Sequence, residues 1–189
     1  HDVAPGAVFW HPKGLIIYKT LHEYVRKITE NEGYKEISTP VMVKNKLFEQ
    51  SGHLEHFGEH NMFNLAIYED DKIAQGKVPT VKIIVNGKEQ EVPKENYSLK
   101  PMNCPESTLI YSTRTRSYQD LPIKFSDYGI LHRRELSGVL GGLFRVRQFT
   151  IDDAHLYVRP DQIQEEIHKL ILLVINFYKS LAFKPEFYF

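Results

Sequence analysis

A strand–loop–strand pattern in the second half of the chain constrains the fold most, because it also carries most of the arginine. Residues 124–131 and 144–151 are predicted strands, and the glycine-rich residues 136–142 form the loop between them. Six of the eight arginines lie between residues 114 and 147, whereas most lysines precede them. Arginine offers a planar fork that binds phosphates and carboxylates, so this hairpin is a candidate polyphosphate clamp.

Side-chain alternation along the two predicted strands sets which charged residues share a face. Arg133 and Glu135 are two residues apart, so they point to the same side of the first strand. Arg145 and Arg147 share a side of the second strand for the same reason, and Phe149 is placed to stack on a base. An exposed hairpin with arginine–glutamate pairs between its strands explains the same pattern, and spacing alone leaves both interpretations open.

Composition narrows the class of protein. The 189 residues suit one compact domain, and 24 basic against 24 acidic side chains leave no formal net charge. This balance excludes a globally basic nucleic-acid coat and an acidic tail. The single cysteine, Cys104, excludes an intrachain disulfide framework, and no apolar run approaches the roughly 20 residues that cross a bilayer. We therefore expect a cytoplasmic protein with no membrane segment.

The remaining segments alternate between helical and β-rich patterns, which predicts an α+β fold. An amphipathic helix over 15–32 is followed by a strand over 34–39, which Pro40 stops. Asn86-Gly87 predicts the turn of a β-hairpin inserted over about 68–96. A helix is expected from Pro105 to about Ser117. The last helix is expected to be capped by Asp161 and to bury one stripe: Ile167, Leu170, Ile171, Val174, Phe177 and Tyr178.

Cys104 and His155 are candidate metal ligands. A lone cysteine is more often a small buried apolar residue, but Asp153 lies beside this histidine in Asp152-Asp153-Ala154-His155. A catalytic zinc ion takes at least three protein ligands, and these two residues supply only two. The spacing of three other histidines makes them formal candidates for a third ligand: His53, His56 and His60.

Two sets of strings resemble the class II aminoacyl-tRNA synthetases. The helix, strand and proline over about 15–40 resemble motif 1 of that class, and residues of about 125–157, including His132-Arg133-Arg134-Glu135, resemble motif 2. Residues 99–105 (Leu-Lys-Pro-Met-Asn-Cys-Pro) and 149–155 (Phe-Thr-Ile-Asp-Asp-Ala-His) are similar to the threonyl-tRNA synthetase family in particular. The resemblance runs from about Val8 to Leu181 and leaves out the 68–96 hairpin.

The resemblance implies an antiparallel sheet flanked by helices, and an enzyme that joins threonine to ATP and transfers the threonyl group to tRNA(Thr). Arg133 and His53 are the catalytic residues that it implies. ATP and Mg²⁺ would meet a set from motif 2: Arg133, Glu135, Arg145, Val146 and Phe149. Threonine would contact a second set of residues: Met102, Cys104, Asp153 and His155. Of these, Cys104 and His155 would also bind Zn²⁺, and the third zinc ligand would lie outside this chain. A homodimer through motif 1 is implied as well.

This sequence departs from the family pattern at several positions. Glu106-Ser107 stands where Gly-His is usual, Gln148 where glycine is usual, and Ile151 where a substrate-binding glutamine is usual. No glycine follows Gly142, so motif 3 is absent, as are editing and anticodon-binding domains. We therefore expect a catalytic domain that is incomplete at its C-terminus and inactive, or nearly so, by itself. A synthetase-like paralogue with a binding or regulatory role is the main alternative, and a prolyl or seryl type of class II synthetase is a weaker one.

Overall fold

The computed structural model describes residues 2–53, 61–66, 80–85, 88–93 and 96–188. The chain divides into two compact units, the first comprising His1–Thr113 and Phe125–His155, and the second Arg114–Lys124 and Leu156–Phe189. Among the helices in the described ranges, none combines the length and the apolar character that crossing a membrane requires.

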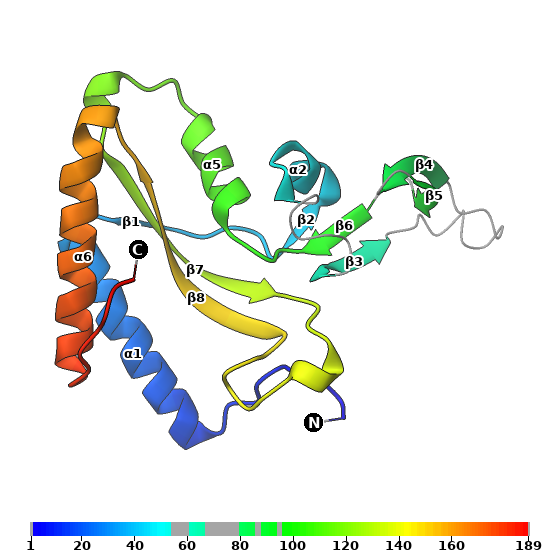
Figure 1. The fold of residues 1–189 in the computed structure, drawn as a ribbon, viewed down its shortest axis with the longest axis horizontal. Helices are drawn as coiled ribbons and strands as arrows, with labels where there is room; N and C mark the ends of the chain where they lie inside the picture. The colour runs from blue at the N-terminus through cyan, green and yellow to red at the C-terminus, as the bar shows by residue number, and fades with distance from the viewer. Residues whose placement is uncertain (1, 54–60, 67–79, 86–87, 94–95, 189) are drawn as a thin grey trace. The chain divides into compact units, whose positions relative to one another are not determined.

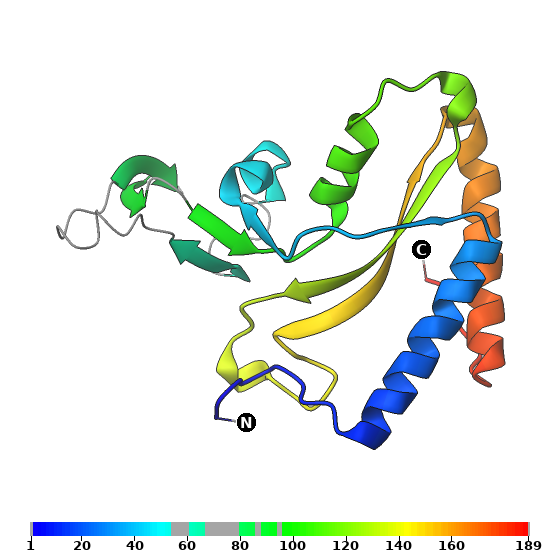
Figure 2. The same ribbon diagram turned by 180° about the vertical axis from the view of Figure 1, so that it is seen from behind.

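A three-stranded sheet in the order β1-β7-β8 positions the candidate site. Its strands are β1 (Lys35–Ile37), β7 (Ile123–His132) and β8 (Gln148–Tyr157), and Figures 1 and 2 show β7 and β8 as two long neighbours. β1 runs parallel to β7, with Lys35 opposite Phe125. The α+β class is therefore confirmed, and the sheet contains one parallel pair as well.

Helix α1 (Pro12–Asn31) packs on this sheet through its aromatic residues. Pro12 suits the first helical turn, where a backbone N–H has no helical partner, and Gly33 follows the helix with a left-handed φ of 82°. The His22 ring lies edge-on to Tyr128 of β7 with centroids 4.4 Å apart, and the Tyr18 hydroxyl donates to Thr150 Oγ1 at 3.1 Å. The predicted helix and the strand after it are thus confirmed.

A second sheet has the order β2-β6-β3, with the short helix α2 (Asn45–Gln50) beside it. Its strands are β2 (Met42–Lys44), β3 (Phe63–Ala66) and β6 (Asn96–Leu99). The fully buried Ser98 hydroxyl donates to Asn45 Oδ1 at 2.7 Å, which ties the helix to the sheet.

The antiparallel pairing of the predicted hairpin is confirmed where it is described. β4 (Thr80–Val85) pairs antiparallel with β5 (Lys88–Pro93), so that Val85 lies opposite Lys88. The predicted turn at 86–87, and the flanking residues 68–79 and 94–95, lie outside the described residues.

Helix α5 (Cys104–Ser112) begins where Pro105 predicted a helix, but it is shorter than expected. It ends five residues before Ser117. That serine instead caps the 3₁₀ turn η2 (Tyr118–Asp120), and its backbone N–H donates to Asp120 Oδ2 at 2.7 Å. The capping groups of this turn compete with helix continuation, which explains the early stop.

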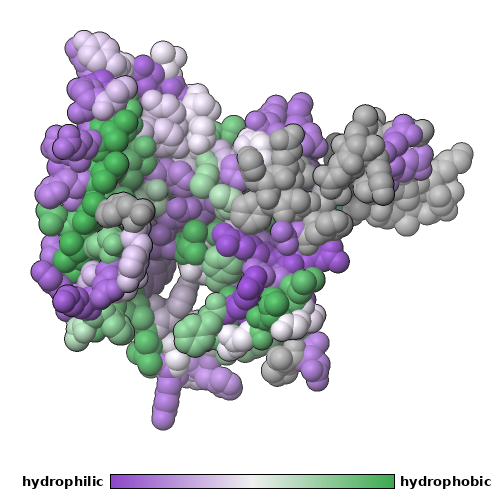
Figure 3. Space-filling view, in the orientation of Figure 1, coloured by the Kyte–Doolittle hydropathy of each residue, from purple (hydrophilic) through white to green (hydrophobic). Residues whose placement is uncertain are grey.

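The second unit is built around helix α6 (Ile163–Ser180), and two expectations about it are wrong. Gln162 occupies the N-cap position, whereas Asp161 lies in the 3₁₀ turn η4 (Pro160–Gln162) and pairs with Arg159 at 3.0 Å. The predicted buried stripe is also partly exposed, since Ile167 is 52% exposed. Figure 3 shows apolar residues along this helix at the surface.

The buried residue of α6 is a charged one. Glu166 is 5% exposed, pairs with Lys124, and accepts from Lys169 Nζ at 3.0 Å. These two ammonium groups, of which Lys124 contributes most, hold the pKa of the Glu166 carboxyl below its ordinary value. Charge pairing, as well as apolar burial, therefore orders this helix within its unit.

Candidate functional site

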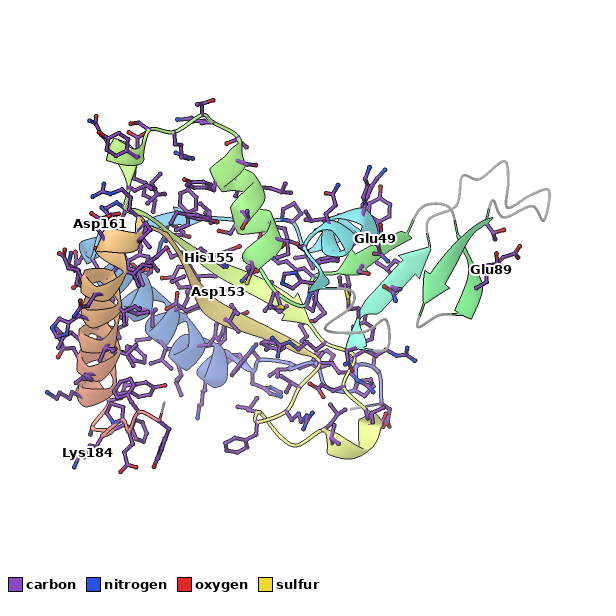
Figure 4. All side chains as sticks on the ribbon, turned by 45° about the horizontal axis from the view of Figure 1, so that its top comes forward. Glu49, Glu89, Asp153, His155, Asp161 and Lys184 are labelled. Carbon is purple, nitrogen blue, oxygen red and sulfur yellow. The ribbon has the colours of Figure 1, made fainter. Side chains whose placement is uncertain are left out.

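The start of α5 and the middle of β8 bring three potential ligands together. Cys104, Asp153 and His155 each offer one ligating atom, and these atoms lie within 4.8 Å of one another. Asp153 and His155 are two residues apart on β8, so the strand's alternation directs both to one face, as Figure 4 shows. All three residues are half-buried, and together they are called the ligand cluster below.

The ligand cluster has the donor chemistry of a zinc site. Thiolate, imidazole and carboxylate are the groups that bind Zn²⁺ in proteins. The Nδ1 atom of His155 is buried and has no hydrogen-bond partner among the described residues, so it retains a coordinating valence. Burial, followed by the negative charge of Asp153, raises the pKa of the Cys104 thiol. A bound cation would reverse that shift by stabilising the thiolate.

The other histidines that we considered do not join this cluster. His53 Nδ1 lies 2.8 Å from Ser51 Oγ, and His53 is not among the residues whose ligating atoms converge. His56 and His60 lie outside the described residues. Within the described part of the chain, the third member of the cluster is therefore Asp153.

The predicted strands are confirmed over residues 124–131 and 148–151, whereas the strand conformation expected for residues 133–135 and 144–147 is wrong. β7 ends at His132 and β8 begins at Gln148, so the intervening residues form a loop that contains the 3₁₀ turn η3 (Ser137–Val139). Strand alternation therefore does not govern these side chains. This loop, residues 133–147, is called the arginine loop below. Its two ends are joined by a backbone hydrogen bond of 2.9 Å from Arg133 N to Arg147 O.

Arg133 is held at the base of the arginine loop. Its Nε donates to the Pro101 carbonyl at 3.3 Å, and its guanidinium carbon lies 5.2 Å from the centroid of the Phe149 ring. A cation at this distance from an aromatic ring is attracted by the ring's negative face. Arg133 and Phe149, both predicted to meet ATP, are thus brought together.

Farther along the loop, Arg145 and Glu135 form the arginine–glutamate pair that was the alternative interpretation of this segment. Nε and Nη2 of Arg145 lie 3.0 and 2.9 Å from one carboxylate oxygen of Glu135. Val146 is half-buried beside them in the chain. The loop's main charged pair is therefore satisfied internally.

Arg147 holds the N-terminal arm against the loop. Its Nε donates to the Glu135 carbonyl at 2.8 Å and its Nη1 to the Pro5 carbonyl at 3.4 Å. Its backbone N–H donates to the Gly6 carbonyl at 2.6 Å. Gly6 has a φ of 81°, and a Cβ there would lie 2.9 Å from Arg147 Cγ, so both conformation and space favour glycine.

Sequence reasoning missed a buried charged group beside the site. Lys100 is fully buried, donates to the Thr39 hydroxyl, and lies 3.8 Å from the Asp127 carboxylate. The backbone around it connects the two sheets, because His132 N donates to the Lys100 carbonyl at 2.9 Å. The sequence carries no burial signal for this lysine, since its partners lie at least 27 positions away.

Two departures from the family pattern lie near the ligand cluster. Glu106 is 4% exposed, and burial raises the pKa of its carboxyl to about 7. Its carboxylate oxygens have no hydrogen-bond partner among the described residues. Ile151 and Met102 are both half-buried. The first turn of α5 thus contains a carboxyl group that is readily protonated near neutral pH.

The family model for the tRNA synthetase class II core domain (G, H, P, S and T) matches residues 85–188, more than half of the chain. Because it covers more than half of the chain, this match shows that the chain belongs to the class II aminoacyl-tRNA synthetase core family.

The relatives are more specific. A threonine–tRNA ligase of Symbiobacterium thermophilum is 42% identical over 185 residues, which cover 98% of this chain and 24% of that protein. One from Caldanaerobacter subterraneus is 40% identical over 184 residues, covering 97% of this chain and 24% of that protein. The chain therefore spans about a quarter of the length of these relatives.

Solved structures agree with this placement. The RNA binding domain of a threonyl-tRNA synthetase from Cryptosporidium parvum has a TM-score of 0.76 and 34% identity, over 95% of this chain and 38% of that one. A Giardia lamblia prolyl-tRNA synthetase in complex with prolyl-adenylate has a TM-score of 0.72 over 93% of this chain and 32% of that one. Its identity of 18% shows only the shared fold.

Proposed function

We propose that this chain is part of the catalytic core of a threonine–tRNA ligase. Such an enzyme activates threonine with ATP to threonyl-adenylate and transfers the threonyl group to tRNA(Thr). The observation that carries the proposal is the convergence of Cys104, Asp153 and His155 within 4.8 Å. The two threonine–tRNA ligases that are 40–42% identical to the chain support it.

Adenylation requires positioning and charge stabilisation more than proton removal. The nucleophile is the amino acid's carboxylate, which is already ionised, and it attacks the α-phosphate of ATP while pyrophosphate leaves. Arg133, held by Pro101 and Phe149, would orient both reactants and stabilise charge at phosphorus. Mg²⁺ bound to ATP would supply further charge neutralisation.

The arginine loop would supply the remaining contacts to ATP. We assign Glu135 to the adenine amino group or the tRNA acceptor end, Arg145 to the γ-phosphate side, and Phe149 to stacking on adenine, with Val146 beside them. Because Arg145 is paired with Glu135, ATP binding must replace that ion pair. The pair is 57% and 23% exposed at its two side chains, and such ion pairs are weak, so the exchange is easily reached.

Cys104 and His155 would hold a zinc ion, which would supply a Lewis acid for the amino and hydroxyl groups of threonine. Asp153 would accept a hydrogen bond from that hydroxyl, and Met102 would contact the substrate beside it. Valine lacks the hydroxyl and would leave buried polar groups unpaired, so it is rejected strongly. Serine lacks only a methyl group, a difference worth about 1–3 kcal/mol.

Three further assignments belong to this proposal. His53, which is paired with the Ser51 hydroxyl, would move a proton during transfer to tRNA. Exposed apolar residues on α1, among them Ile16 at 65% and Ile17 at 63%, support a homodimer through motif 1. We place the reaction in the cytoplasm.

The test is threonine-dependent exchange between ATP and radiolabelled pyrophosphate, measured on the full-length protein with its zinc content. We expect exchange with threonine, weaker exchange with serine and almost none with valine. Zinc bound without exchange would instead support the paralogue with a binding role, for which Glu106 in the first turn of α5 is the favouring observation. Exchange with proline or serine in preference to threonine would overturn the substrate assignment.

A further inference from the structure

Asn103 immediately precedes Cys104, and its side chain does not cap the helix although its position would allow it. It is the N-cap residue of α5, where asparagine commonly accepts a hydrogen bond from the first turn. Its carbonyl does accept the Ser107 N–H at 3.0 Å, but the side chain makes no capping bond among the described residues. Because Asn103 is fully buried, its carboxamide must serve another purpose.

The carboxamide of Asn103 points to the ligand cluster. Its Nδ2 donates to Asp153 Oδ2 at 3.3 Å, across 50 positions of sequence. An ionised aspartate can only accept hydrogen bonds, so the amide nitrogen has to face it. The Asn103 Oδ1 atom is buried without a hydrogen-bond partner in the described part of the chain, so the contact to Asp153 is the one that orients this group.

Gly129 on β7 provides the space that this orientation requires. A Cβ at position 129 would lie 2.1 Å from Asn103 Oδ1, 2.5 Å from Nδ2 and 2.6 Å from Cγ. Gly129 is not among the glycines with positive φ, so its conformation is open to any residue. Glycine is therefore required at position 129 by the space that the Asn103 carboxamide occupies, and not by backbone conformation. Glycine within a strand often marks such a close approach.

We propose that Asn103 is a positioning residue that acts through Asp153. β7 accommodates the Asn103 carboxamide at Gly129, and the carboxamide fixes the Asp153 carboxylate beside Cys104 and His155. One dipeptide, Asn103-Cys104, thus supplies a ligand and orients its acidic neighbour. The effect on threonine recognition rests on the proposed function, whereas the contacts among Asn103, Gly129 and Asp153 do not.

The contacts are tested by thermal unfolding of the full-length protein, followed at the transition of the domain that contains Asn103. We expect Gly129→Ala to lower the Tm by roughly 5 °C or more, because the added methyl group overpacks the carboxamide. In the Asn103→Ala background the same change should cost less than about 2 °C, because the obstructing atoms are gone. An equal loss in both backgrounds would show that Asn103 does not require Gly129, and would overturn this part of the proposal.

The action through Asp153 is tested with a second cycle on the full-length protein. We expect Asn103→Ala to lower the preference for threonine over valine in pyrophosphate exchange towards that of Asp153→Ala, and to add nothing in the Asp153→Ala background. Asn45→Ala is the matched control, because Asn45 is also a buried asparagine, bonded to Ser98, and should lower Tm without changing the preference. An unchanged preference in Asn103→Ala, or additive losses, would overturn a positioning role.

Cobalt spectroscopy separates this proposal from the proposed function. Co²⁺ bound by the full-length protein should keep its thiolate charge-transfer band in Asn103→Ala, while its d–d bands shift as they do in Asp153→Ala. Unshifted d–d bands would overturn the proposal. If the full-length protein neither exchanges pyrophosphate nor binds cobalt, the proposed function fails, and non-additivity of Tm between Asn103→Ala and Asp153→Ala still decides whether the contact exists.

Discussion

The ligand cluster and the arginine loop lie in the same compact unit, but they differ in how far their polar side chains are already paired within the protein. In the cluster, three ligating atoms converge from a helix start and a strand, and His155 Nδ1 has no hydrogen-bond partner among the described residues. In the loop, Arg145 is paired with Glu135 and Arg147 with carbonyl oxygens. The ligating atoms of the cluster are therefore already together, whereas any ligand of the loop would have to replace protein partners.

This difference has a physical basis in the supporting structure. Regular elements hold a side chain through many backbone hydrogen bonds, so they can keep costly unpaired groups close together. A loop has fewer such constraints, and its charged groups lower their energy by pairing with one another. Arg133 is the exception, since Pro101 and Phe149 hold it at the base of the loop.

The largest effect is expected from Arg133→Ala, which removes the arginine that Pro101 and Phe149 hold at the base of the loop. We expect the rate of pyrophosphate exchange by the full-length protein to fall by roughly 100- to 1000-fold, as for other preorganised groups that stabilise a developing charge. Arg134→Ala is the control, because Arg134 is an exposed neighbour. A loss below tenfold in Arg133→Ala would contradict the idea that Arg133 is positioned in advance, unlike the other arginines of the loop.

Cys104→Ser tests whether the cluster binds metal as arranged. Replacing the thiol by a hydroxyl should weaken Co²⁺ binding by about 100-fold, since even partners outside the first ligands cost 10–100-fold. The thiolate charge-transfer band should vanish. His168→Ala, at an exposed histidine of α6, should change neither quantity. Retention of the band in Cys104→Ser would show that Cys104 does not coordinate the metal, and the ligand cluster would then not be a metal site.

Gly6→Ala should separate the two regions. The new Cβ would lie 2.9 Å from Arg147 Cγ at a φ of 81°, so we expect a cost of about 1–3 kcal/mol in the free energy of unfolding. The weakened contact of the arm should raise the KM for ATP while leaving the Kd for Co²⁺ unchanged. Gly138→Ala, where a Cβ meets nothing within 4 Å, is the control. A parallel change in Co²⁺ affinity would show that the regions are coupled.

The smallest effect concerns pH and His132, at the end of β7 before the arginine loop. Burial lowers the pKa of His132 from its ordinary 6.5, and a hydrogen bond with Gln148 offsets this only in part. Below pH 6.5 the unfolded chain binds a proton that the folded chain resists, so this group reduces stability as pH falls. In metal-free chain, His132→Gln should therefore lose less stability than the original between pH 7.5 and 5.5. Equal losses would contradict the shift.

Local signals predicted much of the fold. The apolar periodicity before Gly33 predicted α1, and Asn86-Gly87 predicted the pairing of β4 with β5. Predictions failed where a neighbouring group competed, as at Ser117, whose capping turn ends the helical segment early. The stripe on α6 failed for another reason: periodicity indicates an apolar face but not what covers it, and Ile167 is 52% exposed.

The candidate site divides in the same way. The sequence showed Asp153 beside His155, and the family resemblance paired His155 with Cys104. The structure brings ligating atoms of all three within 4.8 Å, because β8 continues through both residues. The alternation argument for Arg133 and Glu135 was wrong, because β7 ends one residue earlier. A strand boundary depends on which backbone groups find partners, and those partners come from distant segments.

By itself, the sequence determined the family, the two long helices, the β4–β5 hairpin and the residues available for chemistry. Those properties follow from local periodicity and from short strings. Only the tertiary structure decided that Glu135 pairs with Arg145, that Lys100 is buried beside Asp127, and that Asn103 turns from its helix to Asp153. Each choice depends on which of several chemically equivalent partners lies within about 3–4 Å, a distance that only the folded chain sets.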